Sequence, residues 1–201
     1  MPAHKTEMFE IVDEQDQVIG MAPRSACHGN PALVHRVAHV LVLNSRGELL
    51  LQKRSRNKDI QPGRWDTSVG GHLDPGEDYR TAAIREMAEE LGLREVPLTF
   101  LYKSQIRNEI ESENVATFLA RHDGPVCFQQ EEIEEVRFWS AGEIDQTLGT
   151  GVFTPNFEEE WQLFRDWNRR YPAGARPGIG FCAGDTFPDL LGGLAQDGSE
   201  E

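Results

Sequence analysis

The sequence predicts an α+β fold, because segments typical of strands and segments typical of helices are mixed along the chain. Two pairs of short apolar runs are joined by polar turn residues, as in β-hairpins. The segments "DYRTAAIREMAEELGL" and "TPNFEEEWQLFRDWNRR" instead carry apolar residues at helical spacing. Strands and helices do not alternate regularly, so a parallel doubly wound sheet is not expected.

The expected strands follow from the apolar runs and the turns between them. "FEIVDEQDQVIG" predicts a short hairpin with "DEQD" as its turn. "RVAHVLVLNSRGELLLQKR" predicts a longer hairpin whose turn runs from Asn44 to Gly47. A polar loop covers residues 55–64. Further strands are expected near residues 66–69, 98–104, 114–120 and 136–139.

Three helices are expected from their end signals. The first covers residues 78–91 and ends at Gly92, a favoured residue after a helix C-terminus. A short helix in "SAGEIDQTL" has Ser140 as its N-cap. A longer amphipathic helix in "TPNFEEEWQLFRDWNRR" has Pro155 in its first turn.

A chain of 201 residues has room for one domain with a substantial core. We expect this domain to span residues 1–170. The composition changes after Arg170, because residues 171–201 include seven Gly and three Pro and end in "DGSEE". This acidic segment predicts a C-terminal tail that is extended or partly disordered.

The charge and the cysteines exclude several classes of protein. Lys and Arg number 20 against 34 Asp and Glu, for a net charge of −14. This charge opposes binding to a nucleic acid polymer or to an anionic membrane. No apolar run reaches the roughly 18 residues that a transmembrane helix needs. Cys27, Cys127 and Cys182 are odd in number and far apart, which favours a reducing cytoplasm over a disulfide framework.

The first predicted helix concentrates negative charge on one face. Glu86, Glu89 and Glu90 share an arc of roughly 100° when successive residues are placed about 100° apart. The residues expected on the opposite, core-facing side are Ala83, Ile84, Met87 and Leu91. Carboxylate oxygens suit Mg²⁺ or Mn²⁺, and a divalent ion would convert their mutual repulsion into shared coordination. A solvated acidic surface is the more common explanation of such a cluster taken alone.

The surroundings of this cluster favour the metal site. Gly71, five residues, Glu77 and seven residues lead into "REMAEELGL", which begins at Arg85. This spacing resembles the Nudix box, GX5EX7REUXEEXGU with U bulky and apolar, at every specified position. The resemblance implies a Nudix fold, a mixed β-sheet sandwiched between α-helices, and a hydrolase that cleaves a nucleoside diphosphate derivative or a related small-molecule diphosphate.

The resemblance also implies roles for the residues of the box. Glu86 and Glu90 would be the principal metal ligands, and Glu89 a further ligand or the catalytic base. Glu77 would complete the acidic cluster, and Arg85 would hold the glutamates through salt bridges. The Gly70–Gly71 pair could bring a backbone carbonyl to the metal. Chemically, divalent ions would neutralise the phosphoryl oxygens and lower the pKa of a bound water, and a carboxylate would take the proton.

A second group of polar residues lies outside the box. Its members are imidazoles and carboxylates that suit Mn²⁺, Zn²⁺ or a similar ion: His28, His35, His72, Glu111 and Glu113. The two glutamates are two apart on an expected strand and so face the same side. Scattered histidines are more often surface or hydrogen-bonded groups than ligands.

The segments around these residues resemble the Nudix subfamily built like isopentenyl diphosphate isomerase. In that enzyme the positions matching this second group form a metal site, and those matching Arg24, Arg54 and Lys58 hold the substrate diphosphate. Ordinary surface charge is the alternative for these three cations. The isomerase has a cysteine where "TSVGGH" places Gly70, and glycine cannot move a proton. The aromatic residue that steadies its carbocation also has no counterpart near Gly151.

Hydrolysis is therefore the favoured activity. An isomerase with a different acid, and a non-catalytic sensor of a diphosphate ligand, remain as alternatives. Nothing in the sequence supplies a readable motif for base recognition. Four aromatic residues are expected in the core rather than stacked on a base: Trp65, Tyr102, Trp139 and Phe153. A homodimer is a further expectation, drawn from the family resemblance alone.

Overall fold

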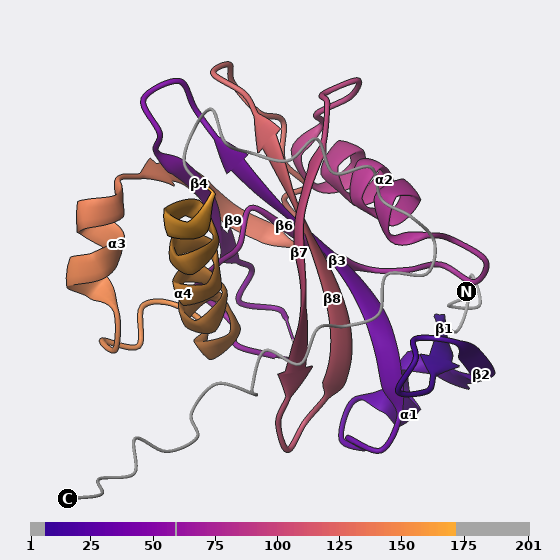
Figure 1. Cartoon of the computed structure of the whole chain (residues 1–201). Helices are drawn as coiled ribbons and strands as arrows, with labels where there is room; N and C mark the ends of the chain where they lie inside the picture. The colour runs from indigo at the N-terminus through magenta and orange to yellow at the C-terminus, as the bar shows by residue number, and fades with distance from the viewer. Residues whose placement is uncertain (1–6, 59, 172–201) are drawn as a thin grey trace, which may run out of the picture.

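The computed structural model describes residues 7–58 and 60–171. The predicted tail, apart from Tyr171, lies outside the described residues. Strands and helices are intermixed, as the sequence predicts (Figure 1). The strands are β1 Met8–Val12, β2 Val18–Pro23, β3 Val34–Leu43, β4 Leu49–Arg54, β5 Trp65–Asp66, β6 Val69–His72, β7 Thr99–Arg107, β8 Ser112–Arg121 and β9 Ile133–Trp139. The helices are α1 Arg24–Cys27, α2 Tyr79–Leu91, α3 Ala141–Thr147 and α4 Pro155–Arg170.

The central sheet is mixed and has β3 near its middle. Strand β3 runs parallel to β8 over its whole length and antiparallel to β6. Strand β4 pairs with β5 and β9, and β7 forms the antiparallel neighbour of β8. The β1–β2 hairpin forms a separate two-stranded sheet beside β3.

Helices cover both faces of this sheet, so the predicted α/β/α arrangement is confirmed (Figure 1). Because side chains alternate along a strand, β3 sends Val40 and Val42 toward α2 and Leu41 and Leu43 toward the opposite face. On that opposite face the core is largely aromatic and includes residues of α4, among them Trp161. The sheet therefore lies between two apolar layers. Polar residues on its strands stand out against these apolar surroundings.

The helix ends match their sequence signals. The Asp78 side chain accepts a hydrogen bond from the Thr81 amide, a cap contributing about 1 kcal/mol. Gly92 adopts the left-handed conformation, with φ 68°, that ends α2. Ser140 forms a capping box with Glu143 at the start of α3.

Four details differ from the sequence prediction. The single strand expected near residues 66–69 is two strands, β5 and β6, which pair with different neighbours. The hairpin of β3 and β4 keeps one residue pair, Leu43 with Leu49, because β6 takes the rest of this edge of β3 and β5 pairs along the same edge of β4. The short helix α1 has no counterpart in the prediction. Ile84 is 48% exposed rather than packed in the core, because it lies at the solvent-facing edge of the α2 apolar stripe.

Within residues 7–58 and 60–171, none of the helices combines the length and the apolar character needed to cross a bilayer.

Candidate active site

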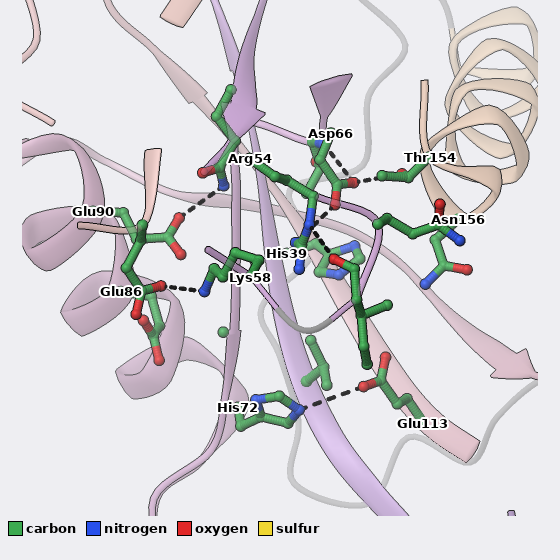
Figure 2. Close-up of a pocket in the computed structure, with 18 of the residues that line it drawn as sticks. His39, Arg54, Lys58, Asp66, His72, Glu86, Glu90, Glu113, Thr154 and Asn156 are labelled. Carbon is green, nitrogen blue, oxygen red and sulfur yellow. Dashed lines mark hydrogen bonds and ion pairs between the residues drawn. The ribbon is translucent and has the colours of Figure 1, made fainter. Parts of the chain in front are cut away.

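A cavity of about 350 Å³ lies where α2, β6, the loop after β4 and the start of α4 meet (Figure 2). It gathers residues that are far apart in the sequence. The predicted site residues that line it are Arg24, His28, Arg54, Lys58, Gly70, His72, Arg85, Glu86, Glu89, Glu90, Glu111 and Glu113. His35 and Glu77 stand behind this lining and contact Glu113 and Arg85, respectively.

The three glutamates of α2 differ in environment. Glu89 is exposed, Glu86 is half-buried and Glu90 is 6% exposed, with its carboxylate accepting a hydrogen bond from Gln52 at 3.0 Å. Burial, together with the charge of Glu86, raises the pKa of Glu90 to about 8. Burial also raises the pKa of Glu86, although the ion pair with Arg85 opposes it. The charged forms of these two buried carboxylates are therefore not fully compensated by the cations around them.

Arg85 links the acidic residues. Its guanidinium donates to Glu77 at 2.8 Å, to Glu86 at 2.7 Å and to the His72 carbonyl at 2.9 Å, and it reaches Glu89 at 3.4 Å. A planar group with five fixed N–H donors can serve several carboxylates at once, which an ammonium cannot do in this geometry. The side chain therefore ties α2 to the end of β6.

Gly71 shows how closely the strand approaches the helix. A Cβ atom on this residue would lie 2.0 Å from the carboxyl carbon of Glu86. Any other residue would force that carboxylate out of its place. The need for close contact between β6 and α2 explains the glycine.

The three predicted diphosphate-holding cations all lie at the cavity but already have acidic partners. Arg24 contacts Glu7 at 3.0 Å and Arg54 contacts Asp66 at 3.1 Å. Lys58 pairs with Glu132. An anionic ligand would therefore compete with these carboxylates for the cations.

Comparisons with known proteins agree with this geometry. The Nudix domain family model matches residues 33–157. The chain belongs to the Nudix hydrolase family. An uncharacterised Nudix hydrolase of Yersinia pestis is 38% identical over 175 residues, 86% of this chain and 93% of the relative. YfcD, an uncharacterised Nudix hydrolase of Escherichia coli K12, is 34% identical and covers 84% of this chain and 92% of its own length.

Solved structures show the same fold. The crystal structure of DR0079 from Deinococcus radiodurans superposes with a TM-score of 0.68 at 25% identity, covering 78% of this chain and 98% of that one. The MutT protein of Methanosarcina mazei Go1 gives 0.59 at 24% identity, over 70% and 97% of the two chains. Nudix hydrolases act on phosphoanhydride bonds and generally use divalent metal ions. Membership of the isomerase-like subgroup stays a prediction, because these relatives carry only the family name.

The acidic end of this Nudix hydrolase fits a divalent cation. Its side-chain donors are carboxylate oxygens, the ligands that Mg²⁺ and Mn²⁺ prefer. A Glu90 pKa of about 8 indicates a buried carboxylate whose negative charge lacks a compensating cation. A divalent ion between Glu86 and Glu90 would supply that charge.

The opposite end of the cavity contains the predicted histidine cluster. One ring nitrogen from each of His28, His35 and His72 lies within 4.8 Å of the others. The Nε2 atoms of His35 and His72 lie 3.3 and 3.5 Å from one carboxylate oxygen of Glu113. Figure 2 shows the contact between His72 and Glu113. His35 Nδ1 lies 3.2 Å from the Leu33 carbonyl, so its Nε2 is turned toward the cluster.

Two further observations suit this cluster to a metal ion. Burial lowers the pKa of His28 to about 4 and also lowers that of His72, so both imidazoles are neutral at pH 7, as metal binding requires. Nε2 of His28 is buried without a hydrogen-bond partner. The Phe9 ring stacks on His35 and His72 at centroid distances of 5.0 and 4.1 Å. The N-terminal hairpin thus covers the cluster.

Several cavity residues were missed by the sequence prediction. They are His39, Gln52, Asp66, Glu132, Thr154 and Asn156. His39 interrupts an apolar run, which was the available signal for this residue, whereas Gln52 only follows one. Glu132 lies in "EEIEE", where nothing in the sequence distinguishes it from its neighbours. The register of β4 with β9 brings this segment to the cavity.

Proposed function

We propose that this protein is a Mg²⁺- or Mn²⁺-dependent hydrolase that cleaves the diphosphate linkage of a small organic diphosphate. The observation that carries the proposal is the shared cavity. The carboxylates of α2 and the cations Arg24, Arg54 and Lys58 line the same space of about 350 Å³. Divalent ions at the carboxylates would neutralise phosphoryl charge and activate water.

The residues of the chain then take distinct roles. Glu86 and Glu90 hold the metal, with the Gly70 backbone as a further donor. Glu89, the most exposed of the three glutamates, is placed to accept a proton or to add a ligand. Arg85 and Glu77 keep these side chains in position through the contacts described above. Three cations bind the diphosphate, and their present ion pairs with carboxylates break when they do so: Arg24, Arg54 and Lys58.

We further propose that the cluster of His28, His35, His72, Glu111 and Glu113 is a second metal site. Its neutral imidazoles suit Mn²⁺ or Zn²⁺ better than Mg²⁺. Glu111 directly precedes β8, and its carboxylate accepts a hydrogen bond from the side chain of Asn156 at 3.2 Å. A cytoplasmic location fits the free cysteines Cys27 and Cys127, and a homodimer stays a prediction.

Product release from a panel of diphosphates, measured with Mg²⁺ and with Mn²⁺, tests the proposal. We expect cleavage of at least one nucleoside, sugar or isoprenoid diphosphate. Conversion of isopentenyl diphosphate to its isomer without cleavage would establish the isomerase instead. Tight binding of one compound without turnover would establish a sensor.

A further inference from the structure

The cavity is polar well beyond the residues assigned to metal and diphosphate. Among its described lining residues, only Val37 and Ile60 carry purely hydrocarbon side chains, and no Phe, Tyr or Trp contributes. Nucleobases are usually held by aromatic stacking, and hydrocarbon tails need apolar walls. The described walls of this cavity offer neither.

The aromatic residues that could have stacked on a base pack in the core or against it instead. Trp139 packs edge-on against Trp65 and Phe153, with ring centroids 5.3 and 5.2 Å away. Tyr102 packs against the same cluster. The sequence prediction that these four residues belong to the core is confirmed, and their rings are unavailable to a ligand in the cavity.

His39 lies between the glutamates of α2 and the Thr154–Asn156 side of the cavity (Figure 2). Its Nδ1 atom is 3.0 Å from a carboxylate oxygen of Glu160 on α4, and Thr117 donates a hydrogen bond to the same oxygen. Glu160 is 5% exposed, so the imidazole is held by a buried carboxylate. The metal and diphosphate roles proposed above do not use this pair.

The other edge of the ring faces the cavity beside Gly70. A Cβ atom on Gly70 would lie 3.4 Å from Cδ2 and Nε2 of His39. Because glycine has no side chain, this edge stays accessible to a ligand. Because Nδ1 is turned to the Glu160 carboxylate, Nε2 is the ring nitrogen left to form a hydrogen bond with a ligand in the cavity.

The opposite wall is polar as well. Thr154 and Asn156 lie at the start of α4 and project side chains toward the cavity (Figure 2). The Asn156 amide and the His39 ring thus line the same cavity, and both can form hydrogen bonds with a ligand. The volume of about 350 Å³ lies near the lower end of the usual range for small-molecule sites.

We propose, building on the hydrolase function above, that the substrate is a compact hydrophilic diphosphate, of the sugar or polyol diphosphate class, and that His39 contacts its non-reacting part through Nε2. Glu160 is a positioning residue, which acts by holding the His39 ring. The diphosphate lies at the α2 end, and the hydroxyls or further phosphate of the substrate lie between His39 and Asn156.

The first test compares kcat/KM for a phosphorylated pentose 1-diphosphate, a nucleoside diphosphate sugar and isopentenyl diphosphate with Mg²⁺ and with Mn²⁺. We expect the pentose compound to be cleaved at least tenfold more efficiently than the other two. Preferential cleavage of the nucleoside or isoprenoid compound would overturn this inference and leave the hydrolase function intact. Cleavage of none of a broad diphosphate panel would overturn both.

The second test separates substrate contact from a structural role. His39→Gln should raise KM for the pentose compound about tenfold and change kcat little. The inhibition constant of inorganic diphosphate, which lacks the non-reacting part, should stay unchanged. Glu160→Gln should act in the same direction, whereas the exposed neighbour Glu159→Gln should have no effect. An equal loss with both ligands, or no change in KM with a folded protein, would overturn the assignment of His39.

Discussion

The two ends of the cavity differ in the groups that surround their carboxylates. At the α2 end, burial raises the pKa values of Glu86 and Glu90, and the charges of neighbouring glutamates add to the rise. At the histidine end, burial would raise the pKa of Glu113, but hydrogen bonds and charges from His35 and His72 lower it. The carboxylates of the first end lack a compensating cation, whereas at the second end His35 and His72 hold the carboxylate of Glu113 through direct contacts.

This difference indicates different dependence on metal ions. At the α2 end, bound cations are needed to neutralise the buried carboxylates of Glu86 and Glu90. Hard divalent ions suit these oxygen donors. At the histidine end, His35 and His72 already contact Glu113, and a bound metal ion would replace these contacts by coordination. We therefore expect catalysis to depend on the α2 end, and the histidine end to affect metal selectivity and substrate placement.

The largest effect is expected from Glu86→Gln, which removes a negative charge while keeping the shape of the side chain. Activity should fall by about a thousandfold, or about 4 kcal/mol of transition-state stabilisation, in a protein that still folds. Steady-state kinetics with Mg²⁺ measures the loss. Glu95→Gln, at an exposed position after α2, is the matched control. Near-normal turnover of the Glu86 variant would refute its role.

Arg85→Lys should have the next largest effect. An ammonium cannot reproduce the simultaneous contacts with Glu77, Glu86 and the His72 carbonyl. We expect kcat to fall by about 30- to 100-fold, about 2–3 kcal/mol, and the Mg²⁺ concentration for half-maximal activity to rise. Arg94→Lys, at an exposed position, should change neither quantity. An unchanged Mg²⁺ requirement would show that Arg85 does not organise the glutamates.

His35→Gln tests the other end of the cavity. We expect it to weaken Mn²⁺ or Zn²⁺ binding at the histidine cluster by about 10- to 100-fold, the usual cost of disturbing a metal site. The Mg²⁺ requirement of catalysis should stay the same. Equilibrium dialysis with metal analysis gives the number of bound ions. His122→Gln, away from the cavity lining, is the control, and equal Mn²⁺ and Zn²⁺ binding by wild type and His35→Gln would contradict a second site.

A smaller effect is expected on stability and its pH dependence. The folded-state pKa of Glu90, about 8, exceeds the ordinary 4.5, so the metal-free protein loses stability as pH rises from about 4.5 to about 8. Glu90→Gln removes this loss and should gain about 2–4 kcal/mol over wild type near pH 8. Urea unfolding in chelator near pH 5 and pH 8 measures the difference. A constant difference between the two proteins across this range would contradict the shifted pKa.

The sequence predicted the elements better than their pairing. End signals such as Ser140, Pro155 and Gly92 are local, and the helices that they predict are present. Strands β3 and β4 pair mainly with β8 and β9 rather than with each other. This pairing depends on contacts between distant segments, which no local sequence pattern encodes. The same reason applies to the cavity. A fixed spacing marks the glutamates of α2, whereas His39 and Glu160 meet only after α4 packs on the sheet.

We infer that carboxylates crowd on α2 because divalent cations bind between them. Calorimetric titration of Mn²⁺ into wild type, Glu86→Gln and Glu90→Gln tests it most directly, with His35→Gln to separate the histidine end. We predict uptake by wild type and by His35→Gln, with at least one binding event lost in each glutamate variant. The same Mn²⁺ stoichiometry and affinity in wild type and both glutamate variants would contradict the claim.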